Sequence, residues 1–473
     1  MFKSIPVEIS NRYDFSIESH PFSIGVPCPE GAILDQTRLR LCLKGKPEPF
    51  YVASLASWPD GSVKWLLLDF QASVAANDKV TLQLDCDIAA NTYGAFSLEA
   101  ARLSISDDDD SYLVDTGVAQ FVINKKRLGI FDQVMCGKRD LLSDMSSGVV
   151  LVDSLGDIAE TTVSSIRISE SKNTLRKVFC IDGFFQRKDN SKLADFNLKL
   201  VFYAGMSTVK CDFTLTNSQA AEHPGGVWDL GDKGSFVFRA LSIKIQLAAT
   251  DEKPKSSIRL SDAADWRLAN SEKLLLEQHS SGGDNWQSKN HMNASGEVLL
   301  AYKGYRYFEK NVELANGSRA TPVINVASDE GSITAYIVDF WQNFPKGIEV
   351  EQSTLLLNLF PQKDSESYEL QGGERKRHTF YLDFSNDKNA LDAYIADITP
   401  RIPLDYYYHA KVIPWLPKVF ENSDIQKLID RGISGKDNFF EKRETIDEYG
   451  WRNFGEIFAD HEGLEYKSDE QLI

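Results

Sequence analysis

The sequence VKCDFTLT at residues 209–216 alternates apolar and polar side chains at every position. A period of two places the apolar side chains on one face of an extended strand and the polar ones on the other. The same alternation occurs at residues 38–44, 80–88 and 241–247. Half-buried strands of this kind are typical of antiparallel sheets with one face on the core and one in water, so the sequence predicts a mainly β protein.

Two further local signals concern a turn and a change of period. Residues 59–62, PDGS, separate two apolar runs, and proline followed by glycine predicts the turn of a β-hairpin. Near residue 386 the period changes, because the apolar residues of 391–398 follow helical spacing up to Pro400. A second short helix is expected from Ser423 to about Gly432, and residues 406–417 between them predict an aromatic, proline-braced crossover.

Charge and composition exclude several classes of protein. The chain has 473 residues and a formal net charge of −17 at pH 7, which argues against nucleic acid because a phosphate binder normally presents a basic stripe. It contains no apolar run of the roughly 18 residues that span a membrane, and its N-terminus lacks the apolar core of a signal peptide. We therefore expect no membrane association and a cytoplasmic location. The six cysteines form no C-x-x-C pair, which predicts reduced thiols.

Several stretches, in order along the whole chain, resemble one known family. PFSIGVP at residues 21–27 and WPDGSVKW at 58–65 are similar to the first, RIFT-barrel domain of the PcRGLX/YetA-like family, which is rhamnogalacturonan exolyase-like. Stretches similar to the β-sandwich domain of that family are HPGGVWDLGD at 223–232, SGGDNW at 281–286, GYR at 304–306, FWQNFPK at 340–346 and LQGGERK at 370–376. The tail, with YGWRNFG at 449–455 and ADHE at 459–462, resembles the entry to its third domain, an α/α toroid.

The resemblance implies a domain organisation. A small RIFT-type β-barrel is expected at residues 1–90 and a large antiparallel β-sandwich at 91–385, with a linker helix and the start of a toroid at 386–473. A dozen helices with their loops need well over 150 residues, and far fewer follow Pro400, so most of the toroid is expected to be absent. Aromatic side chains of an unfinished helical layer should then be partly uncovered, namely Tyr406, Trp415, Phe439 and Phe440. We expect the chain to bind a helical toroid partner chain or to self-associate.

The family's chemistry implies β-elimination on rhamnogalacturonan or another uronate-containing oligosaccharide, without a cofactor, and with most of the toroid absent the chain is expected to be incomplete for catalysis on its own. Such a site neutralises the uronate carboxylate, removes the C5 proton and protonates or stabilises the leaving oxygen. The tail holds the richest set of suitable residues: the predicted catalytic residues are His461, Tyr449 and Arg452, and Trp451 and Asn453 are predicted to contact the sugar. The alternative is that Trp451 belongs to the core and that residues 460–462 cap a helix end.

A second candidate cluster comes from glycine-rich loops of the expected sandwich. Loops on a rigid scaffold often carry function, and this cluster adds the predicted substrate contacts His223, Trp228, Asp229, Trp286, His291 and Arg306. The alternative is that the paired glycines and the aspartates only shape turns. No H-x-H or H-x-x-x-H spacing supports a metal site. If the chain is not a lyase, it is expected to be a non-catalytic carbohydrate-binding or assembly module.

Overall fold

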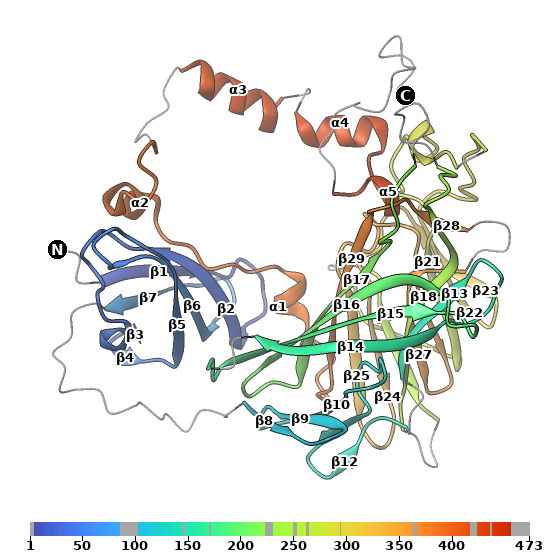
Figure 1. Ribbon diagram of the computed structural model, residues 1–473, viewed down its shortest axis with the longest axis horizontal. Helices are drawn as coiled ribbons and strands as arrows, with labels where there is room; N and C mark the ends of the chain where they lie inside the picture. The colour runs from blue at the N-terminus through green and yellow to red at the C-terminus, as the bar shows by residue number, and fades with distance from the viewer. Residues whose placement is uncertain are drawn as a thin grey trace.

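The computed structural model describes residues 4–85, 103–143, 147–169, 172–222, 230–248, 253–261, 264–293, 295–362, 367–416, 423–435 and 438–455. Strands hold 49% of these described residues and helices 9%, whereas an average globular protein has about 20–25% strand. A small β-barrel and a large β-sandwich are followed by short helices (Figure 1). The predicted fold class is confirmed.

The N-terminal domain consists of two antiparallel sheets, ordered β1-β7-β3-β4 and β2-β6-β5. Its strands are β1 (Ser4–Ser10), β2 (Ile17–Pro27), β3 (Arg40–Leu43), β4 (Lys46–Pro47), β5 (Phe50–Ser57), β6 (Val63–Val74) and β7 (Lys79–Asp85). Alternate apolar residues such as Leu66 and Leu68 on β6 are fully buried in a single core. The predicted hairpin joins β5 and β6, where Gly61 has a φ of 85° and the Trp58 N–H donates to the Ser62 carbonyl at 2.8 Å.

The second domain begins with a small five-stranded sheet, ordered β12-β11-β10-β9-β8. Its strands are β8 (Ser104–Asp107), β9 (Ser111–Asp115), β10 (Gln120–Asn124), β11 (Gln133–Cys136) and β12 (Arg139–Asp140). The side chains on its inner face, including the fully buried Val114, Phe121 and Ile123, belong to the same core as the sandwich. The small sheet and the sandwich are therefore one packing unit.

The sandwich packs an eight-stranded sheet against a nine-stranded one. The first has the order β13-β18-β27-β26-β21-β22-β23, with β28 paired to β18, and the second the order β14-β15-β16-β17-β29-β25-β24-β19-β20. The first sheet contains β13 (Gly148–Asp153), β18 (Phe236–Gln246), β27 (Thr354–Phe360), β26 (Lys346–Glu351), β21 (Lys273–Gln278), β22 (Tyr305–Glu309), β23 (Val312–Gly317) and β28 (Tyr368–Leu370). The second contains β14 (Glu160–Ser169), β15 (Arg176–Gln186), β16 (Lys192–Tyr203), β17 (Thr208–Thr216), β29 (Arg375–Asp383), β25 (Ser332–Ile337), β24 (Val323–Ala327), β19 (Lys255–Arg259) and β20 (Arg267–Leu268).

The alternating stretch at residues 209–216 lies in β17, between β16 and β29. Cys211, Phe213 and Leu215 are fully buried in the core between the two sheets. The described cysteines, which include Cys211, are all free thiols. The period of two therefore indicated the core-facing side of this strand, but the expected water-exposed face is wrong here, because Asp212 and Thr214 on the other side are only 6 and 7% exposed.

The chain that leaves the sandwich returns to the barrel. Helix α1 (Asp392–Ile395) and helix α2 (Leu404–Ala410) contribute apolar side chains to the barrel core, and Glu8 and Arg401 exchange two backbone hydrogen bonds of 2.8 Å. The predicted crossover at 406–417 is wrong in part, because its first residues form α2. The expectation that Tyr406 is uncovered is also wrong, since the barrel buries it to 4% exposure.

Three more helices follow, α3 (Asp424–Ile433), α4 (Phe439–Ile446) and α5 (Gly450–Asn453). Helix α3 begins where the sequence predicted, and Ser423 caps it, because its hydroxyl accepts the Gln426 N–H at 3.0 Å. Figure 1 shows that α3 and α4 connect α2, beside the barrel, with α5, at the sandwich. Within the described ranges, no helix has the length and apolar character to cross a bilayer.

A buried carboxylate joins the barrel to the sandwich. Asp69 on β6 is 2% exposed, and it accepts hydrogen bonds from Asn173 at 2.7 Å and from Ser23. Arg176 on β15 forms an ion pair with Asp69 at 3.2 Å and also donates to Ser23 at 3.0 Å. A buried charge is tolerated only where it has partners of this kind, so the network holds the two domains in register.

His20 marks the same junction. The register of β2 shifts between Ile17 and His20, and Ser19 has a φ of 48°, so a bulge re-aims the strand here. The His20 ring lies 4.5 Å from the ring of Tyr394 and 4.9 Å from that of Phe22. Burial among these rings lowers the pKa of His20 to about 4, so the imidazole is neutral at pH 7.

We predict that Asp69→Ala lowers the free energy of unfolding by about 3 kcal/mol, because it leaves Asn173 and Arg176 without their buried partner. Asp85→Ala is the matched control. It breaks the half-exposed Arg40–Asp85 pair and should cost less than about 1 kcal/mol. Urea denaturation of both variants measures the two values, and equal losses would contradict the assignment of Asp69 as a domain link.

We also predict a specific acid sensitivity from His20. Its folded pKa of about 4 lies below the unfolded value of about 6.5, so the unfolded chain binds the proton first as the pH falls. The stabilisation from neutral His20 is complete above pH 6.5 and is lost toward pH 4, by on the order of 3 kcal/mol. His20→Phe removes this contribution, so its unfolding free energy should fall less between about pH 7 and pH 5. Parallel pH curves for the two proteins would contradict the prediction.

Candidate functional site

The tail after α4 is held against the sandwich by its backbone. Asp447 ends α4 in the left-handed region at φ 54°, and Gly450 follows at φ 86°. The N–H groups of Gly450 and Trp451 donate to the carbonyls of Gln342 and Phe344 at 2.8 and 2.7 Å. A side chain at position 450 would stand 3.0 Å from the Phe344 ring, so only glycine permits this approach.

Two asparagines fix the end of α4 to the loop between β21 and β22. The last carbonyls of a helix have no partner within it, and here the Asn285 amide donates to the Thr445 carbonyl at 2.7 Å and the Asn290 amide to the Ile446 carbonyl at 2.9 Å. Asn453 donates in turn to the Asn290 carbonyl at 3.1 Å. Loop and tail therefore form one assembly.

The centre of this assembly is Asp447, whose side chain is fully buried. One carboxylate oxygen accepts the Ser281 hydroxyl at 2.5 Å, and the other lies 2.7 Å from Nε2 of His291. The His291 side chain is 7% exposed, and its ring packs edge-on against Phe344. A carboxylate on one ring nitrogen fixes the orientation and the tautomer of an imidazole and leaves the lone pair of the neutral ring on the other nitrogen, Nδ1.

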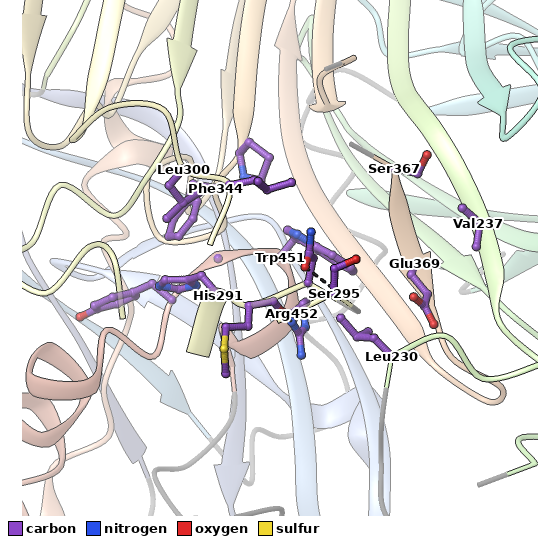
Figure 2. Close-up of a pocket in the computed structure, with 16 residues that line it drawn as sticks. Leu230, Val237, His291, Ser295, Leu300, Phe344, Ser367, Glu369, Trp451 and Arg452 are labelled. Atoms are coloured by element: carbon purple, nitrogen blue, oxygen red, sulfur yellow. Dashed lines mark hydrogen bonds between the residues drawn. The ribbon is translucent and has the colours of Figure 1, made fainter. Parts of the chain in front are cut away.

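His291 lines a pocket between the sandwich loops and α5. Figure 2 shows His291, Trp451 and Arg452 on one side of this pocket and Val237, Ser367 and Glu369 on the other. The rest of the lining combines the apolar residues Leu230, Met292, Leu299, Leu300, Phe344 and Pro345 with Asn293, Ser295, Tyr449 and Gly450. Apolar walls with a few placed polar groups are usual features of a small-molecule site.

Arg452 and Glu369 are the charged groups of the pocket, and protein contacts hold each of them. The Arg452 guanidinium donates to the Met292 carbonyl. Glu369 accepts hydrogen bonds from the Gly231 N–H and the Ser235 hydroxyl, both at 2.6 Å. The geometry therefore places a fixed cation and a fixed anion at the same cavity.

A second, more polar pocket adjoins the first and shares Trp451, Arg452, Glu369 and Leu230 with it. Its other lining residues are Leu370, Gln371, Glu374, Arg375, Lys376, Asn453, Phe454 and Gly455. Burial raises the pKa of Glu374, while Arg452 and Lys376 act in the opposite direction. The pocket thus holds three cationic side chains, those of Arg375, Lys376 and Arg452, and two carboxylates, those of Glu369 and Glu374. Because Glu374 is harder to ionise than usual, positive charge prevails and the pocket is suited to an anionic group.

Tyr449 belongs to a third set of contacts at the edge of the first pocket. Its hydroxyl donates to Glu444 at 2.8 Å, and Arg319 binds the other oxygen of Glu444 at 2.6 Å. The Arg319 guanidinium stacks 4.0 Å from the Trp341 ring, which lies 5.0 Å from Tyr449. Burial and the bond to Glu444 raise the pKa of Tyr449, so the phenol keeps its proton at neutral pH.

Trp451 connects the pockets to the core. Its indole packs edge-on against Tyr368 at 5.6 Å and Phe360 at 6.0 Å. The Phe360 ring centre also lies 5.3 Å from Nζ of Lys346, which is fully buried and donates to the carbonyls of Asn343 and Leu359 at 2.6 and 2.8 Å. Burial lowers the pKa of Lys346, but these carbonyls stabilise its ammonium form. Trp451 therefore has the core role that the sequence left open, while it also lines both pockets.

The structure brings part of the two predicted clusters together. Tyr449, Trp451, Arg452 and Asn453 from the tail meet His291 from the sandwich loops. Trp286 lies half-buried in the loop that contacts α4. Arg306 lies elsewhere, on β22. Its guanidinium carbon lies 4.2 Å from the centre of the Tyr302 ring, and its Nε forms an ion pair with Glu313 at 3.6 Å. His223, Trp228, Asp229 and His461 lie outside the described residues.

Sequence reasoning missed Asp447 and Glu369. Near Asp447 the sequence shows only an acidic residue three positions before a glycine at a helix end. This pattern indicates a helix cap but does not identify the side chains that Asp447 contacts. Its contacts, Ser281 and His291, are 166 and 156 positions away. Among the described side chains, no three His, Cys, Asp or Glu converge as metal ligands.

We predict that Asp447→Ala detaches the tail. Ser281 and His291 lose a buried partner, and the left-handed backbone at position 447 becomes unfavourable for alanine. The amides of Gly450 and Trp451 should then exchange with deuterium at least about tenfold faster, in line with a loss of more than 1.4 kcal/mol of local stability. Asp284→Ala, in the same loop system but fully exposed, is the control. Unchanged exchange in Asp447→Ala would show that the backbone bonds alone hold the tail.

Comparisons with known proteins concern the N-terminal domain and the fold. A family model for the PcRGLX-like N-terminal RIFT barrel domain matches residues 15–85. No curated protein matches the sequence. Among solved structures, the chain is similar to an alpha-mannosidase from Enterococcus faecalis, at 10% identity, covering 85% of this chain and 46% of that one with a TM-score of 0.41.

Two further structures are similar at lower coverage. A galactose mutarotase-like protein from Lactobacillus casei is 8% identical, with 60% of this chain and 99% of that one covered and a TM-score of 0.30. A GH36 alpha-galactosidase from Geobacillus stearothermophilus is 11% identical, with 60% and 41% covered and a TM-score of 0.33. This chain spans less than half the length of the alpha-mannosidase. The sequence of residues 15–85, which contains β2 to β7, is therefore similar to the PcRGLX-like N-terminal RIFT barrel domain.

Proposed function

We propose that this chain belongs to a carbohydrate-active, polysaccharide lyase-like protein that acts by β-elimination on uronate-containing oligosaccharides such as rhamnogalacturonan. The observation that carries the proposal is the pairing of His291 with the buried Asp447 in the pocket that Arg452 also lines. This pairing supplies a fixed proton acceptor beside a fixed cation. The RIFT-barrel match at residues 15–85 supports the same class of protein.

In the proposed reaction, the uronate carboxylate binds in the cation-rich part of the site, at Arg452. Neutralising that carboxylate makes the proton on the adjacent C5 more acidic. Nδ1 of His291 removes this proton, and Asp447 stabilises the imidazolium that forms. The C–H electron pair becomes the C4–C5 double bond, and the bond from C4 to the glycosidic oxygen breaks.

The leaving oxygen must receive a proton. Tyr449 lines the pocket and keeps its phenolic proton because its pKa is raised, so it is the candidate donor. Its hydroxyl must leave Glu444 to reach a sugar. Trp451 presents an aromatic surface at both pockets, and aromatic faces pack well against the apolar face of a sugar ring.

The alternative is a non-catalytic carbohydrate-binding or assembly module. One observation favours it: protein contacts already occupy the polar groups of the candidate site, since Arg452 donates to the Met292 carbonyl and Tyr449 to Glu444. Binding through the same pockets requires no proton transfer. The two functions differ in whether the sugar backbone is cleaved.

The described residues include the proposed base, cation and proton donor, so we predict that the purified chain, mixed with rhamnogalacturonan oligosaccharides, produces the ultraviolet absorbance of an unsaturated uronate even without the rest of the toroid. His291→Gln should lower kcat by about 10²- to 10⁴-fold, because glutamine cannot accept the proton. Arg452→Met should mainly raise KM for the charged substrate. Arg167→Ala removes an exposed arginine on β14 that pairs with Asp182 and serves as the control, with unchanged rates.

The outcomes separate the two functions. Calorimetric binding of the oligosaccharides that is lost in Arg452→Met, without any absorbance change, would replace the lyase by the binding module. An absorbance change that persists in His291→Gln would refute the assignment of the base. If the oligosaccharides give no absorbance change and do not bind, both functions are refuted.

A further inference from the structure

A cavity of about 500 Å³ lies where the barrel, the sandwich and α1 meet. We call it the junction cavity. Its walls come from residues 15–20 of the barrel, from residues 205–208 and Asp383 of the sandwich, and from residues between 385 and 394 at α1. Figure 1 shows α1 between the barrel strand β2 and the sandwich. Small-molecule sites have volumes of about 300–1,000 Å³ and occur preferentially at domain interfaces, so the junction cavity has the size and the place of such a site.

Carboxylates dominate the charge of the junction cavity. Glu18, Asp383, Asp387 and Asp392 line it, and the described residues of its lining include no lysine or arginine. Asp392 forms an ion pair with Arg259 at 2.5 Å. Within the described residues, no ion pair compensates the other three carboxylates. The cavity therefore has an excess of negative charge, which favours a cation over an anion or a neutral molecule.

Asp383 is the most buried of these carboxylates, at 1% exposure. A buried carboxylate normally has a cationic partner or several hydrogen-bond donors. The donors to Asp383 in the described part of the chain are all uncharged, namely the hydroxyls of Ser207 and Thr208 and the N–H and hydroxyl of Ser385. These donors satisfy the oxygens of Asp383 but leave its negative charge at the cavity.

His20 adds a buried polar group that faces the same cavity. It is 8% exposed, its ring lies 4.5 Å from the ring of Tyr394, and both residues line the cavity. Within the described ranges, neither ring nitrogen of His20 has a hydrogen-bond partner. The imidazole is neutral at pH 7, so one nitrogen carries a lone pair. Buried polar groups are normally hydrogen-bonded, and this lone pair can accept a hydrogen bond from a ligand in the cavity.

These groups favour a ligand that combines positive charge with hydrogen-bond donors. A primary ammonium group has both, because it carries three N–H donors and no acceptor. A neutral sugar supplies donors but leaves the carboxylates uncompensated. A metal ion fits less well, since no three His, Cys, Asp or Glu side chains of the described residues converge as metal ligands.

We propose that the junction cavity binds a small organic ammonium compound. His20 accepts one N–H of the ammonium group, and the carboxylates of Glu18, Asp387 and Asp392 balance its charge, to which Asp383 adds. Because the walls belong to both β domains and to α1, the bound ligand stabilises the junction between them. This site is independent of the proposed lyase chemistry.

The test is calorimetric titration of the full chain with three ammonium probes, which are ethanolamine, putrescine and glucosamine. At about pH 6.5 the amines are protonated and His20 is neutral. At least one probe should bind. Ethylene glycol and glucose carry a hydroxyl where ethanolamine and glucosamine carry the ammonium group, so each should bind at least about tenfold more weakly than its matched amine.

Variants locate the bound probe. His20→Phe keeps an aromatic ring but has no lone pair, so it should weaken the binding by about tenfold. Glu18→Gln and Asp387→Asn each remove one charge from an exposed side chain and should weaken it by about two- to fivefold. Asp284→Asn makes the same change of charge at a fully exposed position outside the cavity, and it is the control with unchanged binding. Circular dichroism verifies that each variant keeps its fold.

Three results would overturn the proposal. If none of the three probes binds at millimolar concentration, the junction cavity is not an ammonium site. If glucose binds as tightly as glucosamine, the cavity recognises hydroxyl groups and not charge. If the binding is unchanged in His20→Phe, or in both carboxylate variants, the probes bind elsewhere on the chain.

Discussion

The candidate site depends on one buried carboxylate. Asp447 is fully buried, and a carboxylate removed from water is tolerated only when hydrogen-bond donors surround it. Ser281 and His291 supply those donors from sandwich loops. The need to satisfy this one charge therefore fixes the tail against the loops, orients the imidazole and places Arg452 beside it, so that the stability of the tail and the geometry of the site have the same cause.

The path of the chain explains how the tail reaches this place. After β29 the chain does not continue along the sandwich but returns to the barrel, where α1 and α2 complete the apolar core. It then crosses through α3 and α4 to the sandwich loops (Figure 1). Because α1 and α2 are packed on the barrel, the position of the barrel relative to the sandwich affects where the tail begins. Asp69 and its partners hold that position, so the domain junction and the site are linked through the fold.

Net charge and local charge differ at this site for a physical reason. The chain carries −17 overall, which governs solubility and long-range encounter. In the polar pocket, Arg375, Lys376 and Arg452 lie close together, and burial makes Glu374 harder to ionise. An anionic group that reaches the pocket meets mainly these neighbours. The acidic composition thus argues against nucleic acid without arguing against a carboxylated sugar.

The sequence by itself determined the features that depend on neighbours in the chain. The alternation at residues 209–216 identified β17 and its core-facing side, the PDGS turn identified the β5–β6 hairpin, and Ser423 identified the start of α3. The resemblance at residues 21–27 and 58–65 identified the barrel. For the strand, the turn and the helix start, the feature responsible is a period, a turn dihedral or a cap that spans only a few residues, so its signal is contained within the segment.

Only the tertiary structure decided the rest. Whether Tyr406 would be covered depended on the barrel, which lies hundreds of positions earlier. The partners of Asp447 are 156 and 166 positions away, and nothing near Asp447 specifies them. The sequence named His291 and Arg452 in separate clusters, and the fold made them neighbours. Burial converts a capping aspartate into the centre of a site, and burial is a property of the packed chain that no local pattern contains.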